Sequence, residues 1–205
     1  MKKIDLDARK TMRKIGFIGA CSTGKTTCAS NMLVQMRSDR INAQLLVESA
    51  RFVTFSPELF DTHPATRLHV LMRQIAGECE RYPRDDTDLL ICERTSLDWI
   101  IYYEWTCANV EVDPINEIVE LGWRWLDTYD VLIYLGPYVN YIEDGWRPTD
   151  PDFTKQISDR YEQACTRLRQ RSNGAVLHVL HQDTIDDRVV AANEIARNAV
   201  AAWYT

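Results

Sequence analysis

The feature that most constrains this chain is an apolar segment that runs straight into a glycine-rich turn near its start. The segment KIGFIG covers residues 14–19, and the turn reads GACSTGKT, with Gly19 first and Gly24, Lys25 and Thr26 last. This string fits G-x-x-x-x-G-K-[ST], the phosphate-binding loop between a strand and a helix. Backbone N–H groups of such a loop and the start of its helix surround an anion. The sequence therefore predicts a strand, a phosphate-binding loop and a helix, in that order.

The side chains of this loop have separate expected roles. We expect Lys25 to place its charge on the outer phosphates of ATP and the Thr26 hydroxyl to bind Mg²⁺. The residues expected to contact the nucleotide are Gly19, Ser22, Thr23, Gly24, Lys25, Thr26 and Thr27. The alternative is a chance match in an ordinary turn, which glycine at about 7% of residues produces in on the order of one chain in a hundred. The position between an apolar run and a helical segment favours the nucleotide interpretation.

Apolar runs and helical segments alternate along the rest of the chain. Each strand candidate is almost continuously apolar, as parallel strands covered on both faces are. The expected strands are 13–19, 43–48, 88–92, 130–135 and 175–180, and the expected helices are 25–37, 65–82, 95–108, 114–127, 155–171 and 184–203. Asp113 is the expected N-cap of the helix at 114–127, with Pro114 as its first residue. Asp183 is the expected N-cap of the helix at 184–203. The alternation predicts an α/β fold, an open parallel sheet with helices on both faces.

Length and composition limit the class of protein. Of the 205 residues 45% are hydrophobic and 26% charged, which are ordinary globular values. We expect a polar extension over residues 1–12, one domain over 13–205 and a lid at about 136–154. No apolar run approaches the ~20 residues of a membrane span. The six cysteines form no C-x-x-C pair, which favours reduced thiols and a cytoplasmic protein with no membrane partner.

Charged residues follow the second and third expected strands. Glu48 and Arg51 lie in the stretch LLVESAR after the second strand, and Glu93 and Arg94 follow LLIC. We expect Glu93 to hold Mg²⁺ opposite Thr26. Glu48 is the candidate that accepts the proton of an attacking hydroxyl or orients that group, and its alternative is a solvated strand-end glutamate. Arg94 either contacts the acceptor or the phosphates, or forms a salt bridge to one of the two glutamates.

One long irregular segment follows the fourth expected strand. It reads NYIEDGWRPTDPDF, residues 140–153, and contains Arg147. Long loops in compact domains are usually functional. We expect Arg147 to lie over the γ-phosphate when the lid closes, and its alternative is an exposed surface arginine. Arg51 and Phe52 are expected on the acceptor side, Phe52 by stacking on a ring. Aromatic residues of 95–108 and 114–127 are expected mainly in the core.

Three classes of phosphate-loop protein are separable by motif. A GTPase carries the guanine-reading motif N-K-x-D, which the sequence lacks. A ring ATPase carries four apolar residues followed by Asp-Glu, whereas the third apolar run here is followed by Glu93-Arg94. A small kinase needs a carboxylate near the acceptor, a metal site and mobile arginines. All three are available here, which favours a kinase.

Several segments resemble known kinases. LLICERTSLD is similar to the E-R-S motif after the third strand of deoxyribonucleoside kinases, with Thr95 before Ser96 as a departure. GACSTGKTT, VESAR and EDGWRPTD resemble the small P-loop kinases related to ribosylnicotinamide kinases, and the pattern recurs in bacterial and phage ATPase-like kinases. The resemblance covers about residues 13 to 171. It implies the nucleoside and nucleotide kinase superfamily and a five-stranded parallel sheet in the order 2-3-1-4-5.

The resemblance does not name the acceptor. The leading hypothesis is a nucleoside or nucleotide-like small molecule. A kinase of hydroxymethylated bases in DNA is the alternative; it would need a basic groove, and RLRQR at 167–171 is the only compact basic run, in a chain of net charge −6. A third class is a regulatory ATPase without a small acceptor, which Glu48 and an arginine-bearing lid disfavour. The oligomeric state stays open, with a homodimer as one option.

Overall fold

Five strands form one parallel sheet, in the order that the kinase resemblance implies. The strands are β1 (Arg13–Ile18), β2 (Ala43–Leu46), β3 (Leu89–Cys92), β4 (Val131–Leu135) and β5 (Val176–Leu180). Their order is β2-β3-β1-β4-β5, and all four pairings are parallel. The computed structural model describes residues 12–52, 59, 62–81, 87–137, 151–171 and 174–203, with only the backbone at 51, 52 and 151. The predicted topology is confirmed.

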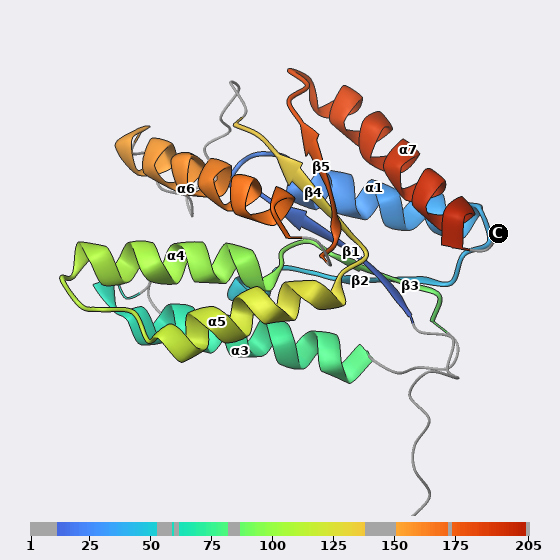
Figure 1. Ribbon diagram of the computed structural model, residues 1–205. Helices are drawn as coiled ribbons and strands as arrows, with labels where there is room; N and C mark the ends of the chain where they lie inside the picture. The colour runs from blue at the N-terminus through green and yellow to red at the C-terminus, as the bar shows by residue number, and fades with distance from the viewer. Residues whose placement is uncertain are drawn as a thin grey trace, which may run out of the picture.

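Helices cover both faces of the sheet (Figure 1). One face carries α1 (Lys25–Ser38) and α7 (Ile185–Trp203), and the other carries α4 (Ser96–Asn109), α5 (Asn116–Trp125) and α6 (Pro151–Arg169). The remaining long helix, α3 (Pro64–Arg81), packs on α4, and the 3₁₀ turns η1 (Ser49–Phe52) and η2 (Leu126–Thr128) follow β2 and α5.

Side chains of β1 alternate between the two cores. Ile15 and Phe17 pack against α1 and α7, whereas Ile18 packs on the side of α4 and α6. A strand buried on both faces needs apolar side chains at every position. That requirement explains why the strands are continuous apolar runs in the sequence and why their positions could be predicted.

Helix starts differ from the predictions at two places. The N-cap of α5 is Ile115, without a side-chain hydrogen bond, so the prediction of Asp113 as the cap and Pro114 as the first helical residue was wrong. At α7 the cap is Thr184, whose Oγ1 accepts a 3.1 Å hydrogen bond from the backbone N–H of Asp187. Asp183 lies one residue too early, because the side chain that accepts from the first turn of α7, which starts at Ile185, is that of Thr184.

The expected lid lies mostly outside the described residues. Residues 138–150, with Arg147, belong to this undescribed part, as do residues 1–11 of the expected extension over 1–12. The helix α6 begins at Pro151, before the predicted start at residue 155. None of the helices among the described residues is long and apolar enough to cross a membrane.

Candidate active site

The phosphate-binding loop lies at the carboxyl end of β1 and leads into α1. Its two motif glycines have positive φ angles, 147° at Gly19 and 91° at Gly24, and Ser22 between them has φ 62°. A Cβ atom at Gly19 would lie 2.6 Å from the carbonyl oxygen of Leu135, and one at Gly24 would clash with the Ile185 side chain. Both backbone angle and space therefore require glycine at these two positions.

The Lys25 ammonium contacts backbone carbonyl groups at the start of the phosphate-binding loop. Its Nζ donates hydrogen bonds to the carbonyl oxygens of Gly19, at 2.7 Å, and Ala20, at 2.5 Å, while the Thr23 hydroxyl lies 3.3 Å away. Only 5% of Lys25 is exposed. Burial, followed by the positive charge of Arg94, lowers the pKa of Lys25 to about 8. The loop thus holds a desolvated cation whose charge an incoming anion would stabilise.

A buried arginine from α7 fastens this loop to the end of β4. Arg188 donates from Nη1 to the carbonyl oxygens of Thr23 and Gly136, both at 2.9 Å, and from Nε to that of Gln182 at 2.7 Å. The side chain is 1% exposed. No sequence motif pointed to Arg188, because its partners lie up to 165 positions away along the chain.

The two oxygen groups expected to hold Mg²⁺ meet beside the loop. The Thr26 hydroxyl donates directly to Oε1 of Glu93, which is 3% exposed. The other oxygen, Oε2, accepts a 3.0 Å hydrogen bond from the backbone N–H of Glu48. Hydroxyl and carboxylate oxygens are ligands that Mg²⁺ accepts, together with water and substrate phosphates. In the part of the chain that the structure describes, no three His, Cys, Asp or Glu side chains form a metal site by themselves. The residues therefore fit Mg²⁺ bound jointly with a nucleotide.

Arg94 and Glu48 form an ion pair next to this group. The distance from Arg94 Nε to Glu48 Oε1 is 2.5 Å, and the two side chains are 6% and 16% exposed. Burial alone would lower the pKa of Arg94, but Glu48 and other acidic groups hold it well above its usual value. The guanidinium carbon also lies 5.3 Å from the ring centre of Trp99 and 5.7 Å from that of Tyr102. The salt-bridge alternative for Arg94 is thus realised in this structure.

Tyr102, expected in the core, also contacts the phosphate-binding loop. Its hydroxyl lies 3.1 Å from Sγ of Cys21, and Arg94 Nη2 lies 3.7 Å from the same sulfur. The guanidinium carbon of Arg67, on α3, lies 5.1 Å from the Tyr102 ring centre. The ring is buried, as predicted, but its polar end reaches the site, which helical spacing alone could not indicate.

Asp98 is a fully buried site residue that the sequence interpretation missed. It lies four residues after Arg94, and its Oδ1 is 3.4 Å from Arg94 Nη1. A signal was present, because Thr95 and Asp98 have the spacing of a capping box. The structure forms that capping box at the start of α4.

Three other predicted residues lie partly or wholly outside the described part of the chain. Arg51 and Phe52 are the last two residues of η1, three and four positions after Glu48, but their side chains are outside the described part. Arg147 lies wholly outside it. Thr27 is an exposed residue in the first turn of α1.

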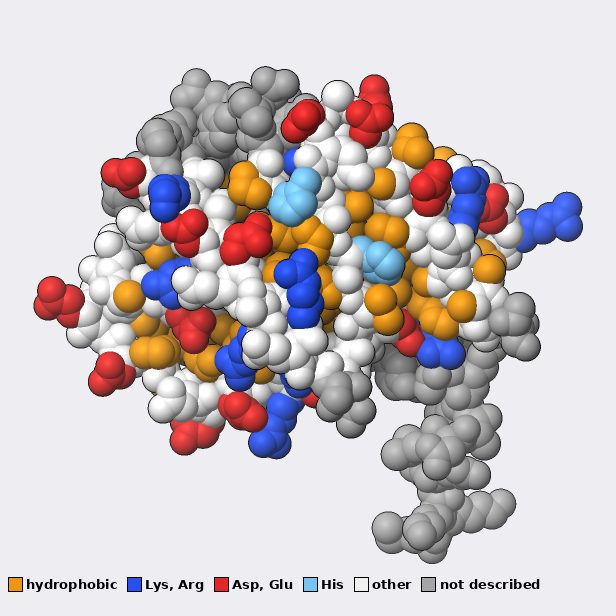
Figure 2. Space-filling model, turned by 45° about the horizontal axis from the view of Figure 1, so that its top comes forward, with side chains coloured by type: hydrophobic (Ala, Val, Ile, Leu, Met, Phe, Trp, Pro, Cys, Tyr) orange, Lys and Arg blue, Asp and Glu red, His pale blue; other side chains and the backbone are white. Residues whose placement is uncertain are grey.

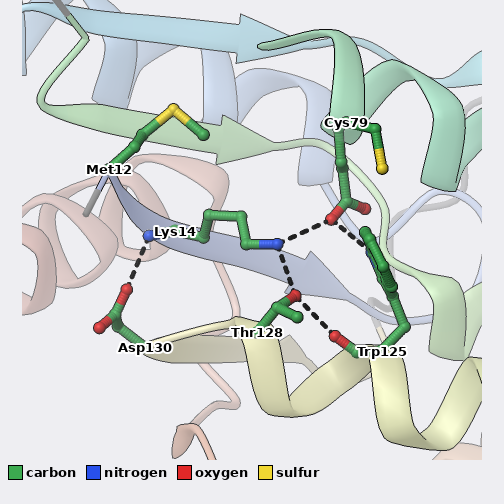
Figure 3. Close-up of a pocket in the computed structure, with 7 residues that line it drawn as sticks. Met12, Lys14, Cys79, Trp125, Thr128 and Asp130 are labelled. Atoms are coloured by element: carbon green, nitrogen blue, oxygen red, sulfur yellow. Dashed lines mark hydrogen bonds and ion pairs between the residues drawn. The ribbon is translucent and has the colours of Figure 1, made fainter. Parts of the chain in front are cut away.

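A cavity of about 350 Å³ lies at the opposite end of the strands, near the start of β1 (Figure 3). The residues that line it are Met12, Lys14, Glu78, Cys79, Trp125, Thr128 and Asp130. Lys14 and Glu78 form an ion pair in its wall, with side chains 6% and 1% exposed. Ligands of open α/β sheets bind at the carboxyl ends of strands, so this cavity at the amino end belongs to the structural core and not to the phosphate site.

The basic run at 167–171 takes part in packing. The guanidinium carbon of Arg167 lies 4.0 Å from the ring centre of Trp123. Arg171 donates to the carbonyl oxygen of Trp123 at 2.9 Å and to Asp127 at 2.7 Å. On the face shown in Figure 2, positive and negative side chains are interspersed. Two of the three arginines thus fasten α6 to α5 and η2.

Comparison with solved structures shows the same fold in nucleoside and nucleotide kinases. Deoxyadenosine kinase from M. mycoides, with the products dCMP and a flexible dCDP bound, is similar with a TM-score of 0.61 and 13% identity, over 92% of this chain and 99% of that chain. Its structure with bound dATP gives 0.58 and 14%, over 92% and 99%. Thymidylate kinase from Ehrlichia chaffeensis gives 0.54 and 16%, over 90% and 98%.

Sequence comparison identifies the family. No curated protein matches the sequence significantly. A family model described as an AAA domain matches residues 14–188, from the first strand to the arginine that braces the loop. Because this match spans most of the chain, the protein belongs to the AAA domain family, and its fold is the one seen in the solved deoxyadenosine and thymidylate kinases.

Proposed function

We propose that the protein is an ATP- and Mg²⁺-dependent phosphotransferase that phosphorylates a nucleoside or nucleotide-like small molecule. The observation that carries this proposal is the contact between two carboxylate residues at the ends of neighbouring strands. Glu93 contacts Thr26 of the phosphate loop, and Glu48 contacts Glu93 through its backbone and Arg94 through its side chain. A donor side and an acceptor side thus adjoin within one hydrogen-bonded group.

On the donor side, Lys25, Thr26 and Glu93 have the principal roles. Bound Mg²⁺–ATP supplies the phosphoryl group and a metal that offsets its charge. Thr26 and Glu93 hold the metal, and Lys25 stabilises the outer phosphates from within the loop. The remaining nucleotide contacts come from the backbone of the loop, with residues Gly19, Ser22, Thr23, Gly24 and Thr27.

On the acceptor side, Glu48 accepts the proton of the attacking hydroxyl. The acceptor oxygen forms a bond to the γ-phosphorus, the bond from that phosphorus to the bridging oxygen breaks, and ADP leaves. Arg94 orients Glu48 or contacts the acceptor. Arg51 and Phe52, which lie in η1 after Glu48, make further contacts with the acceptor. Arg147 places a positive charge near the phosphoryl group that is transferred.

The similar structures support a small acceptor, since they are kinases named for deoxyadenosine and thymidylate. Membrane association is not part of the proposal, and a homodimer is compatible with it. The cytoplasm is the proposed location. DNA as an acceptor has less support, because the net charge is −6 and Arg171 of the basic run already pairs with Asp127.

The test is transfer of label from γ-³²P-ATP to pools of nucleosides, nucleoside monophosphates, ribosylnicotinamide and hydroxymethylated DNA. We expect label in a small molecule, and loss of transfer in Lys25→Ala. The matched control is Lys155→Ala, because Lys155 is an exposed lysine on α6 that pairs only with Asp159 among the contacts described. Label in DNA would support the alternative acceptor, and release of phosphate alone would support a regulatory ATPase. Unchanged transfer in Lys25→Ala would overturn the assignment.

A further inference from the structure

The two oxygens of the buried Asp98 carboxylate have different surroundings. Oδ2 accepts hydrogen bonds from the backbone N–H of Thr95, at 2.8 Å, and from its hydroxyl, at 3.1 Å. Thr95 Oγ1 in turn accepts from the N–H of Leu97 at 3.2 Å. These contacts make up the capping box of α4, which satisfies N–H groups at the start of a helix. This half of the carboxylate has an ordinary structural role.

The other oxygen faces the candidate active site. Oδ1 accepts from the Tyr161 hydroxyl at 2.7 Å, and it lies 3.4 Å from Arg94 Nη1 and 3.4 Å from the backbone N of Gly19. These three groups belong to α6, to the segment after β3 and to the phosphate-binding loop. A helix cap requires none of them. They join three separate parts of the site to a single atom.

Asp98 also contacts the arginine of the ion pair between Arg94 and Glu48. The Arg94 guanidinium lies between two carboxylates, with Nε toward Glu48 and Nη1 toward Asp98. A guanidinium is planar and rigid, so contacts at two of its nitrogens fix its orientation. Contact at one nitrogen alone would let the plane rotate about that contact. Together with the rings of Trp99 and Tyr102, Asp98 therefore orients Arg94 toward Glu48.

We infer that Asp98 is a positioning residue for phosphoryl transfer, an inference that rests on the proposed function. It does not touch the substrate. It holds Arg94, and through Arg94 the Glu48 carboxylate, in a fixed place relative to the phosphate-binding loop, and Tyr161 holds Asp98 itself. Misplacement of a catalytic group by about 1 Å is enough to reduce a rate by roughly 10²-fold.

Asp98→Asn tests this role with little change in size. An amide has one accepting oxygen, so either Thr95 or the group of Tyr161, Arg94 and Gly19 must then face an NH₂ group. We expect kcat for the acceptor to fall by roughly 10²-fold, whereas the Kd for ATP should change much less, since the side chains of Lys25, Thr26 and Glu93 are all still present.

Thr95→Ala is the control for the capping half. It removes the hydroxyl that contacts Leu97 and Oδ2, but leaves Oδ1 with its three neighbours. We expect a lower Tm with kcat of the folded enzyme within about threefold of wild type. If Thr95→Ala reduces kcat as much as Asp98→Asn does, the role of Asp98 is capping and the inference is wrong.

Tyr161→Phe tests whether Tyr161 acts through Asp98. It removes only the hydroxyl from a buried ring. We expect kcat to fall by about tenfold or less alone, and not to fall further when Tyr161→Phe is added to Asp98→Asn, because residues that act through one group are non-additive. Fully additive losses would contradict the inference.

A measurement that does not depend on enzyme activity, the solvent exchange of the Arg94 Nε–H, tests this inference independently of the proposed function. The Arg94 Nε–H signal in ¹H–¹⁵N spectra, assigned with Arg94→Lys, should be protected from solvent exchange in wild type and in Thr95→Ala. It should broaden or lose protection in Asp98→Asn. Absence of label transfer in wild type would refute the proposed function, whereas an unchanged Arg94 signal in Asp98→Asn would refute the positioning role by itself.

Discussion

The backbone N–H of Glu48 donates a 3.0 Å hydrogen bond to Oε2 of Glu93. This contact links the residues that follow β2 and β3, which pair in parallel register with Leu46 beside Cys92. The side chain of Glu93 extends from there to Thr26, and that of Glu48 to Arg94. The two glutamates therefore share one buried group but face different partners, which gives them separable functions.

Glu48→Gln and Glu93→Gln should affect different steps. Glu48→Gln removes the proton acceptor, so transfer to the acceptor should fall by roughly 10²-fold or more, with little change in Mg²⁺–ATP binding. Glu93→Gln should weaken Mg²⁺–ATP binding, because it removes a carboxylate from the metal side. Calorimetric titration with Mg²⁺–ATP and measurement of kcat distinguish the two. Equal weakening of Mg²⁺–ATP binding by both variants would mean that the roles are exchanged.

Nucleotide affinity should decrease above pH 8. Phosphate binding requires the charged form of Lys25, and burial, with Arg94 next in importance, lowers the pKa of this residue from 10.5 to about 8 in the free protein. Below that pH the lysine is charged before binding. Above it a proton must be taken up, so affinity should fall toward about tenfold per pH unit. Titrations in buffers of different ionisation enthalpy measure this uptake.

Lys25→Arg is the control for that pH dependence. Arginine stays charged throughout the accessible pH range. The fall in nucleotide affinity above pH 8 should therefore disappear in this variant, even if the variant binds the nucleotide more weakly or more tightly than wild type. A pH dependence that persists in Lys25→Arg would assign it to another group.

Arg147→Ala should reduce kcat by a factor on the order of 10² while ATP affinity changes less. This is the result expected when a positive charge acts mainly in the transition state. Arg124→Ala is a matched control, because Arg124 is an exposed helical arginine paired with Glu120. An effect of Arg147→Ala limited to KM would make it a ground-state binding residue.

Cys21 should be alkylated faster than the buried cysteines. Burial raises its pKa, but Arg94, Lys25 and the Tyr102 hydroxyl together lower it below the ordinary value. Burial raises the pKa of Cys28 to about 11. Iodoacetamide labelling at pH 8 with peptide mapping, in a Cys79→Ser background to remove an exposed thiol, measures the order. Mg²⁺–ATP should protect Cys21, and labelling of Cys28 at an equal rate would contradict the prediction.

Glu78→Ala should destabilise the protein at a distance from the site. The Glu78 carboxylate accepts hydrogen bonds from Gln74 and Tyr129 on one oxygen, and from Trp125 and Lys14 on the other. Its removal leaves a buried ammonium without its carboxylate, which costs about 3–5 kcal/mol. Urea unfolding followed by circular dichroism measures this loss.

The control for that loss is Glu120→Ala on the exposed face of α5. Exposed ion pairs contribute about 0–1 kcal/mol, so this variant should unfold close to wild type. A loss for Glu78→Ala no larger than that for Glu120→Ala would mean that the hydrogen-bonded group around Glu78 contributes little to stability.

The sequence by itself determined the elements and the phosphate-binding loop. Its apolar runs identified all five strands, because the pattern is complete within four to six consecutive residues. The glycines at 19 and 24 were identifiable for a similar reason, since the loop requires them through its own backbone. The neighbouring positions of Glu48 and Glu93 followed from the strand order, which the resemblance supplied.

Only the tertiary structure decided which side chains surround Arg94. Asp98 could be read as a capping residue, but its contacts with Gly19 and Tyr161 cross 79 and 63 positions of the sequence. Tyr102 has the helical spacing of a core residue and is buried, yet its hydroxyl meets the phosphate loop because α4 packs beside β1. Periodicity and turn chemistry are properties of adjacent residues, whereas the partner of a buried polar group depends on how separate helices pack, and that is fixed only in the folded chain.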